Sequence, residues 1–130
     1  MRPQVFLEDR MKIVNTVGRV VVGSAFMMFG YEAAKEPGSR VQAVEALGVP
    51  QPELAVRLNG AAMIAGGAAL ATGVCARAGA AGLALSLLPT SVAGHPYWQE
   101  SEESKLVPQR IHFQKNLALA GALAAYAFKK

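Results

Sequence analysis

Long stretches without formal charge most constrain how this chain can fold. Nineteen residues separate Arg57 from Arg77 and 22 separate Arg77 from Glu100, and neither stretch contains Asp, Glu, Lys or Arg. A third window, residues 13–31, has Arg19 as its single charged residue. A helix needs about 20 mostly apolar residues to cross the hydrocarbon core of a bilayer, whereas a soluble helix of that length needs a polar face toward water. The sequence therefore predicts an all-α integral membrane protein.

Composition limits the other classes of protein. The chain has 130 residues, of which 52% are hydrophobic and 17% charged, against about 25% charged in an average soluble domain. This length suits one domain, residues 1–130. The net charge of +4 is compatible with nucleic-acid binding, but the bases lie outside the apolar windows, which favours the lipid bilayer as partner. A single cysteine, Cys75, excludes an intramolecular disulfide, a CxxC redox pair and a cysteine-rich zinc site.

Four membrane-spanning helices are predicted, over residues 13–31, 54–76, 78–93 and 108–128. Between the first two, Val41, Val44 and Leu47 recur at helical spacing, which predicts a short interfacial helix within residues 39–49. Pro52 suits the start of the second span, and Pro89 is expected to kink or end the third. The polar residues 1–12 are expected to lie along the membrane surface. The predicted architecture is a four-helix membrane bundle.

Charge sets the predicted orientation. Four spans place both termini on one side, with seven Lys and Arg residues against six on the other side. The positive-inside rule then predicts cytoplasmic termini and a multi-pass protein of the inner membrane. A cleaved signal peptide is the alternative interpretation of the first apolar stretch, although Glu8, Asp9 and the length of the polar lead favour a retained helix.

Small residues are expected to hold the second span in place. This span has few large apolar side chains and contains Asn59, so its insertion is marginal by itself. Ala62-x-x-x-Gly66 and Ala65-x-x-x-Ala69 have the spacing that lets two membrane helices approach closely.

Polar and aromatic groups near membrane depth are the candidates for a ligand-binding pocket. Each also has a simpler interpretation: Arg19 can extend toward the interface, Asn59 can bridge helices, and Trp98 suits an aromatic belt. Neither histidine belongs to a compact metal motif, and Cys75 lies at the opposite end from both, so we predict no metal site, no catalytic residues and no enzyme activity for the chain alone. The candidate pocket comprises Arg19, Asn59, His95, Trp98, His112 and Asn116.

Three stretches resemble the DoxX family of small four-helix bacterial membrane proteins. They are Gly18-Arg19 to Phe29-Gly30, Leu58-Asn59-Gly60 to Thr72-Gly73 with Arg77, and Lys115 to Gly121, with a further likeness at His95 to Trp98. The resemblance implies a helical bundle associated with quinone-linked sulfur oxidation or with thiol and oxidative-stress systems. Many members have an acidic residue near the position of Met63. Because this chain has methionine there, the resemblance does not support proton or cation chemistry through that carboxylate.

Two functions fit these observations. The first is a non-catalytic subunit or scaffold that holds a membrane or redox protein partner, or a second copy of itself. The second is a redox accessory that binds a quinone or another lipophilic ligand through the candidate pocket. The Gly and Ala surfaces favour the first.

Overall fold

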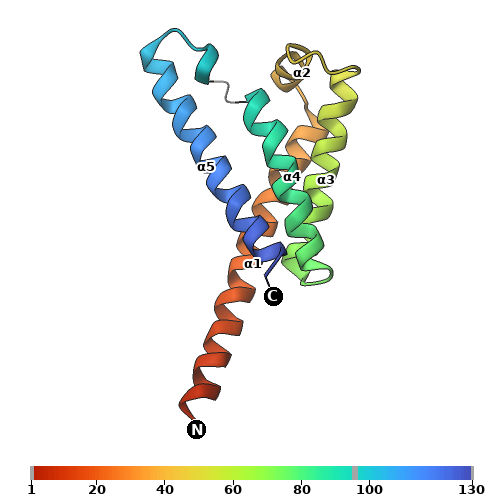
Figure 1. Cartoon of the computed structure of the whole chain (residues 1–130). Helices are drawn as coiled ribbons and strands as arrows, with labels where there is room; N and C mark the ends of the chain where they lie inside the picture. The colour runs from red at the N-terminus through yellow and green to blue at the C-terminus, as the bar shows by residue number, and fades with distance from the viewer. Residues whose placement is uncertain (1, 95–96, 130) are drawn as a thin grey trace.

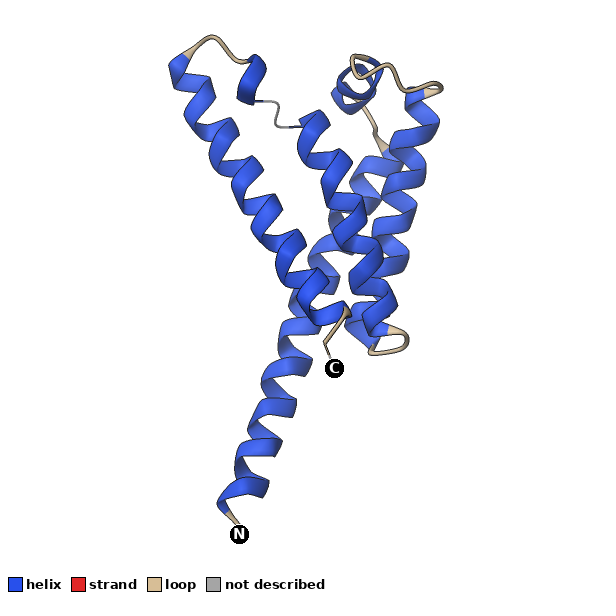
Figure 2. Cartoon of the chain, in the orientation of Figure 1, coloured by secondary structure: helices blue, strands red, loops and turns tan. Residues whose placement is uncertain are grey.

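The computed structural model describes residues 2–94 and 97–129. These residues form α-helices and no strand (Figure 2), which confirms the predicted all-α class. The helices are α1 (Pro3–Lys35), α2 (Ser39–Glu45), α3 (Pro52–Thr72), α4 (Ala76–Gly94) and α5 (Glu103–Ala127), with a 3-10 turn, η1 (Tyr97–Gln99), before α5. A helix therefore occupies each of the four predicted long stretches, and α2 lies within the predicted short one.

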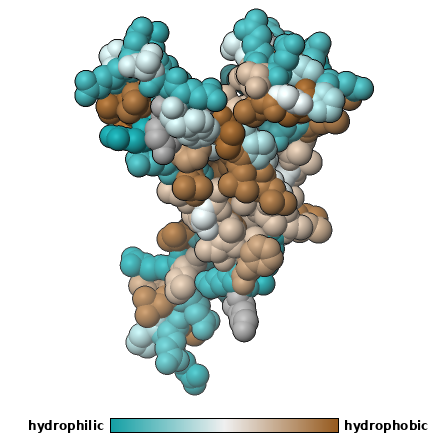
Figure 3. Space-filling view, turned by 45° about the horizontal axis from the view of Figure 1, so that its top comes forward, coloured by the Kyte–Doolittle hydropathy of each residue, from teal (hydrophilic) through white to brown (hydrophobic). Residues whose placement is uncertain are grey.

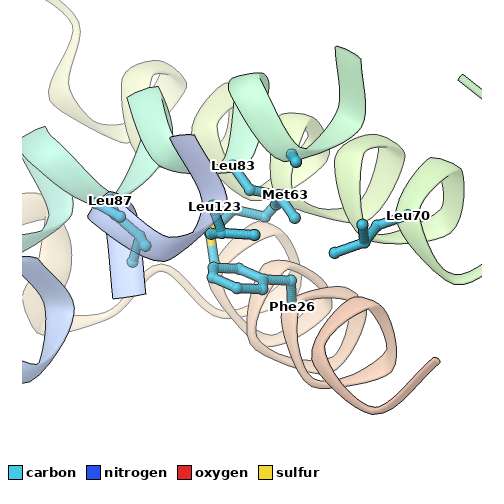
Figure 4. Packing of buried hydrophobic residues seen from close by; sticks show 8 residues of the cluster. Phe26, Met63, Leu70, Leu83, Leu87 and Leu123 are labelled. Carbon is cyan, nitrogen blue, oxygen red and sulfur yellow. The ribbon is translucent and has the colours of Figure 1, made fainter. Parts of the chain in front are cut away.

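The long helices pack in the order α1, α3, α4, α5. α1 lies along α3, and α4 lies between α3 and α5. Figure 1 shows α5 close to α4 at its C-terminal end and diverging from it toward η1. All four long helices contribute to one core, which contains Phe26, Met63, Leu83 and Leu123 (Figure 4). α5 therefore joins the core through its C-terminal half, and its polar N-terminal half stands apart.

One helix differs from its predicted course, and another runs through a proline. Residues 3–12 continue α1 as one helix that projects past the other elements (Figure 1), rather than forming a separate segment along the membrane surface. α4 continues through Pro89 to Gly94 and does not end there. Thr90 Oγ1 donates to the Ser86 carbonyl and Ser91 Oγ donates to the Leu87 carbonyl, both at 2.7 Å. These bonds tie the turn after Pro89 to the carbonyls before it, whereas the carbonyl that lacks its usual donor because of Pro89 is that of Leu85.

Four glycines bring the backbones of α1 and α3 into contact. A Cβ atom at Gly67 would lie 2.5 Å from the Gly23 carbonyl oxygen, and one at Gly60 would lie 2.6 Å from the Gly30 carbonyl oxygen. The reverse pairs are equally crowded, so no larger residue fits at any of the four positions without a backbone shift. In each helix the two glycines are seven residues apart, which keeps both on one face. The two helices are therefore joined at two levels by direct backbone packing.

A second small-residue contact joins α3 to α4. A Cβ atom at Gly79 would lie 2.8 Å from both the Gly66 carbonyl oxygen and Ala69 Cβ. The predicted role of Gly66 and Ala69 in close helix packing is therefore confirmed. Ala62 and Ala65, the other members of the predicted motifs, are exposed.

The surface of the long helices is largely apolar. α1 and α3 are long and apolar enough to cross a bilayer, yet only 17% and 28% of their apolar windows are buried. A core helix of a water-soluble protein would be mostly buried, so these helices present their apolar side chains outward. Figure 3 shows hydrophilic residues gathered at the two ends of the molecule, with a hydrophobic band between them. By length and composition, the structure thus supports two of the four predicted spans directly.

We expect Gly67→Ala to destabilise the protein by about 1–3 kcal/mol, because the added methyl group forces apart two backbones that are already in contact. Thermal unfolding in detergent measures the effect. Gly82→Ala is the matched control, since a Cβ atom at Gly82 meets nothing within 4 Å, and alanine there is expected to be neutral or to stabilise α4 by up to about 1 kcal/mol. Equal melting temperatures for the two variants would contradict the proposed packing.

Candidate functional site

The structure distributes the predicted site residues over separate places. Arg19 lies at the α3–α4 connection, Asn59 lies between α3 and α4, and Trp98 lies in η1 beside α5. His112 and Asn116 are one turn apart on α5, as their spacing predicts. His95 lies outside the described residues. The described members of this set thus do not converge on one pocket, because Arg19 contacts Gly73 in the α3–α4 connection, whereas Trp98 belongs to η1, and these two elements lie at opposite ends of the molecule (Figure 1).

Arg19 interacts with the C-terminal end of α3. Its Nη1 donates to the Leu70 carbonyl oxygen at 3.4 Å, and its Nη2 donates to Thr16 Oγ1 at 3.4 Å. α3 ends one residue before Gly73, whose φ of +83° suits glycine, and any Cβ there would overlap the Arg19 guanidinium. A cation at the C-terminus of a helix is favoured by the exposed carbonyls and the helix dipole. This contact gives Arg19 a structural role at the end of α3.

Arg57 makes the corresponding contact at the other end of the α1–α3 pair, a role that the sequence analysis missed. Its Nη1 donates to the Ala34 carbonyl oxygen, in the last turn of α1. Its Nη2 also pairs with Glu53 Oε1 at 3.0 Å. An arginine three or four residues before a glycine occurs in both helices, and that shared spacing is the sequence feature that could have revealed the pair.

Asn59 is the centre of a polar network between α3 and α4. Its Oδ1 accepts a hydrogen bond from Ser86 Oγ at 2.8 Å, and its Nδ2 donates to Thr90 Oγ1 at 3.1 Å. Nδ2 also lies 3.8 Å from the Met63 sulfur. Thr90 Oγ1 in turn donates a hydrogen bond to the Ser86 carbonyl oxygen, which closes the network. Asn59 therefore bridges two helices, as its simpler interpretation predicts, and its polar atoms are already engaged.

Aromatic and polar side chains gather where η1 meets α5. The rings of Trp98 and Phe113 meet edge to face, with centroids 5.4 Å apart and an interplanar angle of 89°. Such pairs contribute about 0.5–1.5 kcal/mol beyond their area burial. α5 begins at Glu103, earlier than the predicted 108, so His112 and Asn116 lie inside the helix rather than at its start. Trp98 and His112 thus lie near the η1 end of α5, and Asn116 lies one turn further along, near the middle of the helix.

Charge and metal-binding capacity differ between the two ends. In residues 2–94 and 97–129, no three His, Cys, Asp or Glu side chains come together as metal ligands would. The ion pairs found in these residues, Arg57–Glu53 at 3.0 Å and Lys105–Glu102 at 3.4 Å, both lie at the η1 end. Cys75 is exposed in the α3–α4 connection at the other end. The candidate residues offer hydrogen-bonding groups and aromatic rings, which suit the binding of a ligand.

The fold and these contacts define a helical membrane protein whose helices are joined by glycine packing and a polar bridge. The model of the DoxX family matches residues 14–96, which span most of α1 and all of α2 to α4. The chain belongs to the DoxX family, which confirms the resemblance seen in its sequence. It is 29% identical over 115 residues to "Inner membrane protein YphA" of Escherichia coli (strain K12), a match that covers 88% of this chain and 81% of the relative. No solved structure matches the chain significantly.

We expect a double-mutant cycle of Asn59→Leu and Ser86→Ala to give a coupling free energy of about 0.6 kcal/mol or more, up to about 1.7 kcal/mol, which are the average and the maximum measured for hydrogen bonds between membrane helices. Reversible unfolding in mixed micelles provides the four free energies. The control cycle pairs Asn59→Leu with Ser91→Ala, since Ser91 bonds to the Leu87 carbonyl of its own helix. Similar coupling in both cycles would show that the network has no specific energetic role.

Proposed function

We propose that this chain is a multi-pass inner-membrane subunit without catalytic activity of its own, which holds a partner protein in a membrane complex. Its E. coli relative is named as an inner membrane protein, and the family resemblance associates such subunits with redox systems. The α1–α3 pair, fixed by four glycines, supplies a rigid frame for that role.

The proposed topology has α1, α3, α4 and α5 crossing the bilayer as a four-helix bundle, with both termini in the cytoplasm. α3 and α4 are joined by residues 73–75, so they enter the membrane as a hairpin. The hydroxyl groups of α4 are hydrogen-bonded to Asn59 or to carbonyls of their own helix, which lowers the cost of placing them in hydrocarbon. α5 supports the bundle through Ala120 and Leu123, which are buried in the common core.

The length of α1 carries the scaffold proposal. Its 33 residues span about 50 Å at 1.5 Å per residue, whereas the hydrocarbon core is about 30 Å thick. The N-terminal turns therefore extend beyond the hydrocarbon. They nevertheless expose Val5, Phe6, Leu7 and Met11 by 45–68%. Apolar side chains clustered outside the hydrocarbon favour an interaction surface for another protein.

A photo-crosslinking amino acid at Phe6 tests this proposal in native membranes. We expect a crosslinked complex of defined mass, because the projecting turns of α1 contact the partner. The same probe at Gln42 in α2 is the control, since that residue is exposed at the other end of the molecule. Two differently tagged copies of the chain distinguish a second copy from another protein. Recovery of the uncrosslinked monomer alone at Phe6 would count against the scaffold.

The η1–α5 cluster favours a second candidate, a redox accessory that binds a quinone or similar lipophilic ligand. Trp98 and Phe113 provide an aromatic edge, and His112 and Asn116 project from one face of the same helix. Quinone rings stack on aromatic side chains, and their carbonyl groups accept hydrogen bonds from such polar groups.

We expect His112→Ala with Asn116→Ala to weaken binding of a ubiquinone analogue, as measured by quenching of the Trp98 fluorescence. Trp98 is the sole tryptophan of the chain, so the signal reports on this cluster alone. Arg19→Gln is the control, because Arg19 lies at the opposite end. Unchanged quenching in the double variant would exclude a quinone site here.

A further inference from the structure

An apolar groove of about 500 Å³ runs along the surface between α4 and α5. α4 contributes Ala81 and Leu88 near the two ends of its side, and α5 contributes Leu117, Gly121 and Phe128 along the other. A Cβ atom at Gly121 would meet nothing within 4 Å. The groove therefore has open space at its floor and walls of hydrocarbon, and it shares none of the candidate site residues.

The length of the groove matches one leaflet of a bilayer. Leu117 and Phe128 are eleven residues apart in sequence, which corresponds to about 16 Å along the helix axis at 1.5 Å per residue. Half of a hydrocarbon core of about 30 Å is about 15 Å. An extended acyl chain lying parallel to the helices fits this length.

The Phe128 end of the groove carries positive charge. Arg77 precedes Ala81 by four residues and so lies on the same face of α4, one turn beyond the groove. Lys129 directly follows Phe128. Both side chains are exposed, and within the described part of the chain neither is recorded in an ion pair. The acids of residues 32–53 and 100–103 belong to the opposite end of the molecule, and Glu8 and Asp9 lie on the N-terminal turns of α1, which project beyond this end (Figure 1).

We propose that this groove binds one acyl chain of an anionic phospholipid, whose phosphate group is held by Arg77 and Lys129. The apolar groove is about one leaflet long and has two exposed basic side chains beyond one end. It is therefore complementary to such a lipid in both shape and charge. A zwitterionic lipid gains less from the two bases, because its headgroup carries a compensating positive charge. The inference rests on the proposed crossing of the bilayer by α4 and α5.

Native mass spectrometry of the full chain in detergent tests the charge component. We expect phosphatidylglycerol to bind about tenfold more tightly than phosphatidylcholine with the same acyl chains, because bases close to an anionic lipid each add to the attraction. Arg77→Gln with Lys129→Gln is expected to remove most of that preference. The control, Lys35→Gln with Arg40→Gln, removes the same charge at the other end and is expected to retain it. Equal binding of the two lipids, or equal loss in both double variants, would overturn the proposal.

Filling the groove tests the apolar component. We expect Gly121→Leu to weaken binding of both lipids several-fold, whereas Gly82→Leu, which also enters open space but lies outside the groove, leaves binding unchanged. Both variants must keep the wild-type circular dichroism and elution volume. Identical lipid binding by the two variants would contradict the groove as the site. A species of twice the chain mass that Gly121→Leu abolishes would instead assign the groove to a second copy. Neither outcome depends on whether Phe6 crosslinks to a partner, so this proposal and the scaffold proposal fail separately.

Discussion

Backbone contact between α1 and α3 is the constraint on which the rest of the structure depends. Gly23 meets Gly67 and Gly30 meets Gly60, and the two levels have matching surroundings: a Cβ atom at Gly23 would press on Ala71, and one at Gly60 would press on Ala34. Arg19 and Arg57 extend this match, because each donates to a carbonyl near the C-terminal end of the other helix. Lipid offers no hydrophobic force to bring helices together, so close packing and these end contacts supply the attraction.

The helices α4 and α5 pack onto this pair progressively less closely. α4 joins α3 through the Gly66–Gly79 contact and the Asn59 network, which uses hydroxyl groups that would otherwise be costly in hydrocarbon. α5 joins only through its C-terminal half, since its other half is polar and diverges (Figure 1). The family match covers α1 to α4 and ends at residue 96. The looser attachment of α5 leaves the apolar groove and the η1–α5 cluster at the surface, where we propose that ligands bind.

Much of the fold could be predicted from charge spacing, because each charge-poor window is occupied by a long helix. The charges do not mark every helix end: Arg77 lies at the start of α4, whereas Arg57 lies in the second turn of α3. Helical spacing puts Gly23, Phe26 and Gly30 on one face of α1, and the structure buries all three. The contacts of the candidate site residues were harder to predict from the sequence. A helical spacing shows which residues share a face, but not which helix that face meets, so the pairing of Arg19 with the end of α3, and of Arg57 with the end of α1, could not be read from either segment alone. Pro89 does not end α4, and the sequence alone could not decide between a kink and a helix end at this position.

The central claim is that α3 crosses the membrane antiparallel to α1, and thiol labelling tests it most directly. Cys75 is exposed in the α3–α4 connection, and Ser39 is exposed at the start of α2 beyond the other end of the pair. A maleimide that cannot cross membranes is applied to inside-out and right-side-out vesicles containing either the native chain or Ser39→Cys in a Cys75→Ser background. The account predicts that Cys75 reacts in inside-out vesicles and the thiol at position 39 in right-side-out vesicles. Reaction of both thiols from the same side would contradict it.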